Sequence, residues 1–371
     1  MKKIGIITLQ GDNYGATLQA VALNKKLNDL GYDAENLDYN DKKRVLSGLS
    51  LKGRVKFFLR QKVIIPILIG NKRKKNFNAF RKNYLKLSSD RWDSKEKLAQ
   101  NPPQYDVYIS GSDQIWNPDV INNDYNYLLA FAPDESKKIA YASSFGKAEI
   151  SEDKYDIYKH YLSRYNHLAV RENSGQKLVE KLTGRSCYTV VDPTLLLTEQ
   201  EWSEMASAQK DTEPYILCYY MPGDKLVCDA ICKIATALSK KTGKKVINLG
   251  LKEHYVLKPG LDFRATAGPA EFISLFLNAD CIVTNSFHGT AFATNFNKQL
   301  YVPINSKILG KGARHTRMID YLNLIELSDA IVLVDENFTF SEHSLDYTKP
   351  RENIIKNREA SINYLLNSIN S

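Results

Sequence analysis

The segment ADCIVTNSFHGTAFATNF, residues 279–296, contains the pattern that best indicates the fold. Residues 281–284 are typical of a short buried strand, residues 285–289 of a tight turn, and residues 290–297 of the start of a helix. His288 then lies at the carboxyl end of a strand, where open α/β sheets bind ligands. The helix that follows favours a phosphate or a carboxylate at its N-terminus. His288 is therefore the first candidate for a catalytic residue, and a histidine that only caps the turn is the alternative.

Strands and helices alternate on both sides of this segment. A strand is expected near residues 4–9, and the helix expected over residues 16–30 has apolar residues every three or four positions. The alternation is interrupted by a polar stretch at residues 198–214 and then resumes. Further strands are expected at residues 34–37, 106–110, 138–142, 167–171, 188–191, 215–219, 245–249 and 300–303, and further helices at residues 172–182, 224–241, 270–277 and 347–369.

This order predicts an α/β protein with two Rossmann-like domains and an interdomain cleft. The N-terminal domain is expected at residues 1–197, with a basic helical insertion at residues 41–86. A short helix and linker at residues 198–214 lead to the C-terminal domain at residues 215–345. A last helix is expected at residues 346–371, and a path back to the first domain is one possibility for it. The length of 371 residues, with 43% hydrophobic and 25% charged residues, suits two globular domains.

Cysteine usage and the N-terminal sequence favour a cytoplasmic protein. The five cysteines are an odd number without a CxxC pair, which fits a reducing compartment. The start, MKKIGIITLQG, has only a short apolar run and is expected to form the first strand, not a signal peptide. No apolar run approaches the roughly 20 residues that cross a bilayer.

The positive charge of the chain is concentrated in one segment. The net charge is +9, whereas residues 41–86 hold fifteen Lys or Arg and one acid. Within this segment, residues 55–70 mix apolar and basic side chains, and such a stretch can bind the anionic inner face of the cell membrane. A pair of solvated helices with one packed face is the alternative. Nothing resembles a base-reading module, so we expect no nucleic acid partner.

Six segments along the chain occur in the order typical of one family. They are NYGATLQAVAL from Asn13, GSDQIWNP from Gly111, ASSFG from Ala142, VRENSG from Val170, VDPTLLL from Val191 and TNSFHGTAFATNF from Thr284. Together they resemble the polysaccharide pyruvyl transferase family, from the first strand to about Arg317. The resemblance implies a GT-B-like fold and transfer of a pyruvyl group from phosphoenolpyruvate to two hydroxyls of a sugar. The product would be a pyruvate ketal, phosphate would be released, and no separate cofactor is expected.

The resemblance also implies residues for the donor site. Arg171 matches an arginine that binds the donor, whose carboxylate and phosphate suit bidentate guanidinium contacts. A structural ion pair of Arg171 with Glu172 or Asp192 is the alternative. His288 matches the histidine of the family and is expected to act as the general acid. Ser286, Gly289 and Thr290 are assigned to the same donor site.

One departure from the family concerns a missing cation. Many members have an arginine where this chain has Ser286. Arg317 is the nearest replacement that matches a basic position of the family, and Arg314 is the second candidate. For Arg314 and His315, structural roles are the alternative. If neither arginine serves this purpose, the chain would bind a different donor.

The acceptor site is expected to lie in the first domain. Asp113 can orient or deprotonate the sugar diol, with Gln114 beside it and Trp116 stacked on a sugar ring. Asn13 and Tyr14, in the turn of residues 11–15, are further acceptor candidates. A plain turn and a helix-capping Asp113 are the alternatives. No His, Cys and carboxylate cluster has the spacing of metal ligands, so we expect no metal.

Three functions remain open from the sequence. The first is a pyruvyl transferase that acts on a surface polysaccharide or on its lipid-linked repeat unit. The second is a GT-B-type glycosyltransferase with a nucleotide sugar as donor, which rests on fold analogy alone. The third is a catalytically silent, anion-binding or membrane-associated partner protein. The acceptor sugar, the hydroxyls that are bridged and the oligomeric state cannot be derived from the sequence.

Overall fold

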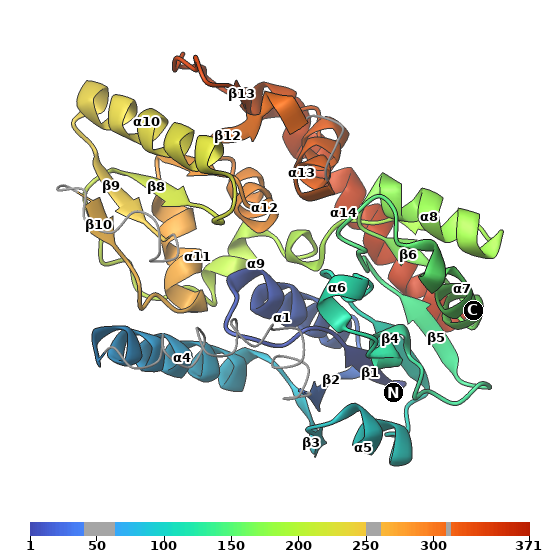
Figure 1. The fold of residues 1–371 in the computed structure, drawn as a ribbon. Helices are drawn as coiled ribbons and strands as arrows, with labels where there is room; N and C mark the ends of the chain where they lie inside the picture. The colour runs from blue at the N-terminus through green and yellow to red at the C-terminus, as the bar shows by residue number, and fades with distance from the viewer. Residues whose placement is uncertain (41–63, 250–260, 309–312) are drawn as a thin grey trace. The chain divides into compact units, whose positions relative to one another are not determined.

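A computed structural model describes residues 1–40, 64–249, 261–308 and 313–371. The chain divides into two compact units. Unit 1 comprises Met1–Leu196 together with Arg358–Ser371, and unit 2 comprises Leu197–Asn357. Figure 1 shows the elements of each unit along the chain.

The core of unit 1 is a parallel sheet of five strands in the order β3-β2-β1-β4-β5. Each strand pairs in parallel with its neighbour, as in a Rossmann-type sheet. β6 and β7 pair with each other and extend the layer beside β5 through isolated bridges. The strands are β1 (Lys3–Ile7), β2 (Asp33–Tyr39), β3 (Leu87–Trp92), β4 (Val107–Ser110), β5 (Lys137–Ala140), β6 (Ala169–Val170) and β7 (Tyr188–Thr189).

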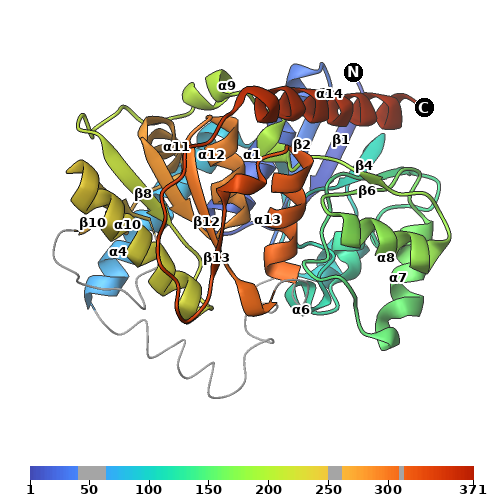
Figure 2. The same cartoon turned by 90° about the horizontal axis from the view of Figure 1, so that it is seen from above.

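The helices of unit 1 include the last helix of the chain. They are α1 (Tyr14–Asp29), α4 (Ile64–Tyr84), α5 (Lys95–Gln100), α6 (Pro118–Ile121), α7 (Tyr155–Ser163), α8 (Asn173–Thr183) and the end of α14 (Thr348–Asn370). The Tyr364 hydroxyl donates to the carbonyl of Ala140 in β5, and the Ser361 hydroxyl accepts from the amide of Val191. The last part of α14 therefore packs on the sheet of unit 1, and the long red helix can be followed in Figure 2.

Unit 2 has a parallel sheet of six strands in the order β10-β9-β8-β11-β12-β13. β11 lies near the centre, between β8 and β12. Its strands are β8 (Tyr215–Tyr219), β9 (Lys245–Asn248), β10 (Leu261–Phe263), β11 (Cys281–Thr284), β12 (Gln299–Asn305) and β13 (Ile331–Val334). Its helices are α9 (Glu199–Ser203), α10 (Lys225–Thr242), α11 (Pro269–Asn278), α12 (Phe287–Asn295) and α13 (Ala313–Leu324), followed by the first part of α14.

Residues 198–214, expected as a short helix and linker, belong to unit 2. They begin with α9, whose N-terminus has a capping box made by Thr198 and Glu201. Trp202 of α9 is fully buried and packs on Phe292, with 5.0 Å between the ring centroids. The short helix expected in this segment is thus present, and its aromatic residue anchors the segment by packing on α12.

Residues 41–63 lie outside the described part of the chain. The apolar and basic stretch at residues 55–70 falls largely within this gap and in the first turns of α4, whose side chains up to Ile69 are also not described. Within the described residues, no helix combines the length and the hydropathy that a bilayer span requires.

Candidate functional site

The turn between β11 and α12 is shorter than expected. Ser286 is the N-cap of α12, and its hydroxyl accepts from the amide of Gly289 at 3.5 Å. The Thr284 hydroxyl accepts from the Ser286 amide at 3.1 Å. These bonds complete the turn with Asn285 and Ser286, so the helix begins at Phe287 and not near Thr290. His288 consequently lies in the first turn of α12, close to the positive end of the helix dipole.

Gly289 and Thr290 hold α12 against the sheet. A Cβ atom at Gly289 would come within 2.4 Å of the Thr284 hydroxyl oxygen and 2.9 Å of the Tyr219 ring, so only glycine fits here. The Thr290 side chain is fully buried and donates to the Ser286 carbonyl at 3.1 Å. The expected donor contact of Thr290 is therefore corrected to a structural role, because its hydroxyl is shielded from any ligand.

Asn285 joins the ends of two neighbouring strands, and sequence reasoning missed it. Its amide oxygen accepts from the backbone amide of Met221, and its amide nitrogen donates to the carbonyl of Met221, at 2.7 and 3.0 Å. Met221 follows β8, which pairs with β11. The signal in the sequence is an asparagine directly after a buried strand, where a side chain can replace a missing backbone partner.

Phe287 and Tyr321 connect the start of α12 to α13. The Phe287 ring lies edge-on to the ring of His288 at 5.4 Å and also packs on Tyr321 at 5.9 Å. Tyr321 shares a hydrogen bond of 2.7 Å with Thr294 of α12. His288 and Arg317 are both partly buried, and Arg317 lies one helical turn before Tyr321 on the same face of α13. The side chains of Arg314 and His315 lie outside the described residues.

Arg171 of unit 1 is buried among three carboxylates. Its side chain is 2% exposed, and its Nη1 donates to Asp192 at 2.6 Å. The nearest oxygens of Asp113 and Glu172 lie 3.7 and 3.8 Å from the guanidinium nitrogens. Burial by itself lowers the pKa of Arg171, but the charges of the three carboxylates reverse this and raise the pKa above its ordinary value. This geometry favours the structural ion pair over the direct donor contact.

Further polar side chains enclose this cluster. Ser112 donates to Asp192 at 3.1 Å, and Ser144 donates to Glu172 at 2.7 Å. Asp192 also caps the short helical turn at Pro193–Leu195, since its other oxygen accepts from the amide and the hydroxyl of Thr194. The cluster thus links the ends of β4, β5 and β6 to the segment that follows β7.

Asp113 is the carboxylate of this cluster that reaches solvent. Its side chain is 16% exposed, against 2% for Glu172 and 0% for Asp192. Its φ of 68° lies in the left-handed region, which costs a non-glycine residue conformational energy. Its carbonyl accepts from the amides of Ile115 and Ser144, and these bonds keep the turn in this conformation. Partial exposure and backbone strain are compatible with the expected role on an acceptor hydroxyl.

The other acceptor candidates are mostly engaged in local contacts. The Asn13 side chain is the N-cap of α1 and accepts from the amide of Ala16 at 3.2 Å. Tyr14 is 2% exposed, and its hydroxyl accepts from Arg73 at 2.7 Å. Gln114, which is partly exposed, accepts from the side chain of Asn117 at 2.9 Å. The buried Tyr14 is corrected to a structural residue that joins α1 to α4.

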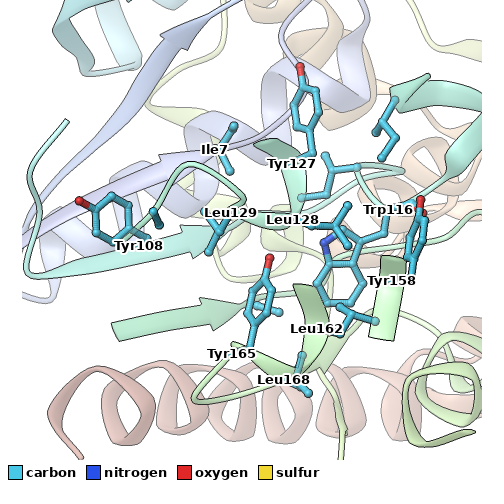
Figure 3. Packing of buried hydrophobic residues seen from close by; sticks show 14 of the residues in the cluster. Ile7, Tyr108, Trp116, Tyr127, Leu128, Leu129, Tyr158, Leu162, Tyr165 and Leu168 are labelled. Carbon is cyan, nitrogen blue, oxygen red and sulfur yellow. The ribbon is translucent and has the colours of Figure 1, made fainter. Parts of the chain in front are cut away.

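Trp116 does not lie at the surface, which corrects the expected stacking on a sugar. Its side chain is fully buried, and its Nε1 donates to the Ser110 hydroxyl at 3.1 Å. The rings of Phe145 and Tyr165 pack on it at 5.4 and 5.7 Å. Figure 3 shows the indole within the core of unit 1, beside Tyr158 and Leu162. Trp116 therefore anchors the polar turn that precedes it.

No group of three or more His, Cys, Asp or Glu side chains among the described residues has the arrangement of a metal site. All five cysteines are free thiols, and Cys232 is the one that is partly exposed.

Comparison with protein families gives a match over most of the chain. The sequence profile of the polysaccharide pyruvyl transferase family matches residues 13–305. The chain belongs to this family. The matched range contains Asp113, Arg171 and His288, whereas Arg317 lies beyond it. A search of curated proteins gives no match.

Solved structures share the fold of this pyruvyl transferase family member. One is a UDP-GlcNAc 2-epimerase from Methanocaldococcus jannaschii in complex with UDP-GlcNAc and UDP, at 12% identity and a TM-score of 0.53, covering 97% of this chain and 93% of the other. Another is S. aureus MnaA with UDP, at 13% identity and a TM-score of 0.50, covering 100% and 98%. The prediction of an α/β fold with two Rossmann-like domains of GT-B-like type is confirmed.

Proposed function

We propose that the protein transfers a pyruvyl group from phosphoenolpyruvate to two hydroxyls of one sugar and forms a cyclic pyruvate ketal. Membership in the polysaccharide pyruvyl transferase family carries this proposal. Within the matched range, the placement of His288 in the first turn of α12 supports it, because a histidine there lies where a helix N-terminus favours an anionic ligand. Phosphoenolpyruvate acts as co-substrate, and no further cofactor is needed for this chemistry.

The proposed reaction begins with proton transfer from His288 to the methylene carbon of phosphoenolpyruvate. The double bond is lost, the carbon becomes a methyl group, and the oxocarbenium-like centre is attacked by the first sugar hydroxyl. The second hydroxyl then displaces phosphate, which closes the ketal. The two hydroxyls release two protons: one replaces the proton given by His288 and the other leaves with phosphate.

The charge of the donor requires cations or helix N-termini. In unit 2, the N-terminus of α12 supplies positive potential, and Arg317 is the cation that we assign to the donor. Ser286 and Gly289 contribute by shaping this turn through their capping bond. Arg171 is assigned an indirect role, since its guanidinium is occupied by the three carboxylates and holds Asp113 in place.

The acceptor remains a proposal based on the family and on Asp113. The expected acceptor is a sugar diol of a surface polysaccharide or of its lipid-linked repeat unit, processed on the cytoplasmic side of the membrane. Asp113 is proposed to accept a hydroxyl proton or to orient the diol, with Gln114 as its neighbour. Asn13, which is exposed in the turn before α1, is kept as a further acceptor contact.

The test compares two histidine variants in a phosphate-release assay with phosphoenolpyruvate and a panel of sugar diols. His288→Gln should lower turnover by about 10²-fold or more, as expected for a lost general acid, while phosphoenolpyruvate still raises the melting temperature. The matched control is His160→Gln, at an exposed histidine of α7, which should keep normal turnover. Full turnover of His288→Gln would refute the assignment of the acid.

A nucleotide sugar is the second candidate donor. Two structures with a similar fold, at TM-scores of 0.53 and 0.50, were determined with UDP, one of them also with UDP-GlcNAc. The same thermal-shift series therefore includes nucleotide sugars. If only nucleotide sugars stabilise the protein, the proposal of pyruvyl transfer is replaced by one of glycosyl transfer. Binding of phosphoenolpyruvate without phosphate release for any acceptor in the panel would favour a catalytically silent, anion-binding protein.

A further inference from the structure

The two arginines of α4 and its lysines point in different directions. Arg73 stacks over the rings of Tyr14 and Phe77, with its guanidinium carbon 4.4 and 4.8 Å from the ring centroids. Arg81 donates to the carbonyl of Gly11 and forms an ion pair of 2.9 Å with Asp12. Both arginines are thus engaged with the turn at the start of α1. They fix α4 to unit 1 and contribute little free charge to the surface.

The opposite face of α4 is strongly cationic. Lys72, Lys74, Lys75 and Lys82 are exposed, whereas Phe77 and Phe80 are buried. Lys72, Lys75 and Lys82 follow the three- and four-residue spacing that places side chains on one side of a helix. The sequence of α4 contains no acidic residue. Among the described residues, no carboxylate forms an ion pair with any of these four lysines, so their charge faces solvent.

We propose that this lysine face of α4 binds the anionic surface of a phospholipid bilayer. Figure 1 shows α4 as one continuous helix, and a rigid row of cations suits a flat anionic surface better than a small anion. The apolar side of α4 is occupied by packing on unit 1, so the attraction is electrostatic and does not require insertion. The inference does not depend on the proposed transferase chemistry.

The charge complementarity sets the size of the effect. A cation near an anionic bilayer improves partitioning by about fivefold at low ionic strength, so four lysines together change it by a few hundredfold. The attraction should fall steeply as salt is added, because surface charges are screened beyond a Debye length. A merely solvated helix face would show neither property.

The experiment measures co-sedimentation of the full chain with vesicles of phosphatidylcholine alone or mixed with phosphatidylglycerol. The test variant replaces Lys72, Lys74, Lys75 and Lys82 with glutamine. The control variant replaces the same number of exposed lysines on α10, at Lys225, Lys233, Lys240 and Lys241. Both sets lie on solvent-facing helix surfaces, so both variants should melt near the wild-type temperature.

The expected result is salt-sensitive binding to the mixed vesicles, lost by about two orders of magnitude in the α4 variant and kept in the α10 variant. Equal binding to both vesicle types would overturn the proposal, as would an unchanged α4 variant or equal losses in both variants. Duplex DNA serves as a second polyanion. Retention on DNA without binding to anionic vesicles would also overturn it, in favour of a nucleic acid partner. None of these results depends on phosphate release, so failure here leaves the proposed function intact.

Discussion

Replacement of Arg171 by methionine separates the two roles that this residue can have. Methionine keeps an unbranched apolar stem but removes the cation that faces Asp113, Glu172 and Asp192. Asp192 is 0% exposed and Glu172 2% exposed, so solvent cannot take over from the guanidinium. If Arg171 is mainly structural, the variant should lose stability; if it mainly binds the donor, the variant should lose phosphoenolpyruvate binding at nearly constant stability.

The structure predicts the first outcome and its size. Removal of one partner from a buried ion pair costs about 3–5 kcal/mol, because the remaining charge has lost its compensation. Here three carboxylates remain within 4 Å of the vacated position, so we expect the upper part of that range. A loss of about 4–5 kcal/mol is a large fraction of the 5–15 kcal/mol that stabilises a typical domain.

Urea unfolding followed by tryptophan fluorescence measures this effect. Trp92 and Trp116 lie in unit 1 and Trp202 in unit 2, so a Trp202→Phe background makes the signal report on unit 1. Arg91→Met is the matched control: Arg91 is 61% exposed and lies 3.8 Å from Asp38, so its loss should cost at most about 1 kcal/mol. A loss below about 1 kcal/mol for Arg171→Met, together with lost phosphoenolpyruvate binding, would refute the structural reasoning.

Three further predictions concern stability. Gly289→Ala should lower the free energy of unfolding, measured with urea, by about 1–3 kcal/mol, because the new Cβ would overlap Thr284. This cost should outweigh the higher helix propensity of alanine, and unchanged stability would contradict the packing. Lys138→Met should lower the free energy of unfolding by about 1–3 kcal/mol in the same measurement, because the buried ammonium donates to the carbonyls of Pro133, Asp134 and Ser136. An unchanged free energy of unfolding would mean that these carbonyls find other partners. Burial, helped by the charges of two neighbouring basic side chains, lowers the pKa of His167, so the unfolded chain binds the proton first. Stability should therefore fall as the pH drops below about 6.5, and His167→Gln should reduce this slope in denaturation measured across that range; an identical slope would contradict it.

The sequence predicts regular elements well where their pattern is strong. The strands Tyr215–Tyr219 and Cys281–Thr284 occur with the predicted bounds, because both are mostly apolar and bounded by turn residues. β3, with the sequence LSSDRW, was not predicted, since it is an edge strand with mostly exposed polar side chains. The start of α12 was placed too late because capping by Ser286 depends on a hydrogen bond that the order of residues alone does not reveal. The strand expected at residues 167–171 is reduced to β6, Ala169–Val170, because the chain turns where Arg171 enters its carboxylate cluster.

Candidate site residues are harder to predict, because polar residues at strand ends have two competing uses. A parallel sheet leaves turn backbone to be satisfied at the carboxyl ends of its strands, and side chains there are the nearest partners. Asn285 fulfils this need for Met221, Ser112 for the carbonyl of Ala142 and Asp192 for the amide of Thr194. Partly exposed side chains that do not serve as partners of turn backbone are better candidates for chemistry, and this criterion retains His288 and Asp113. The criterion depends on burial and on hydrogen-bond partners. Both follow from the three-dimensional fold, which explains why a motif locates the site but does not divide its residues between structure and chemistry.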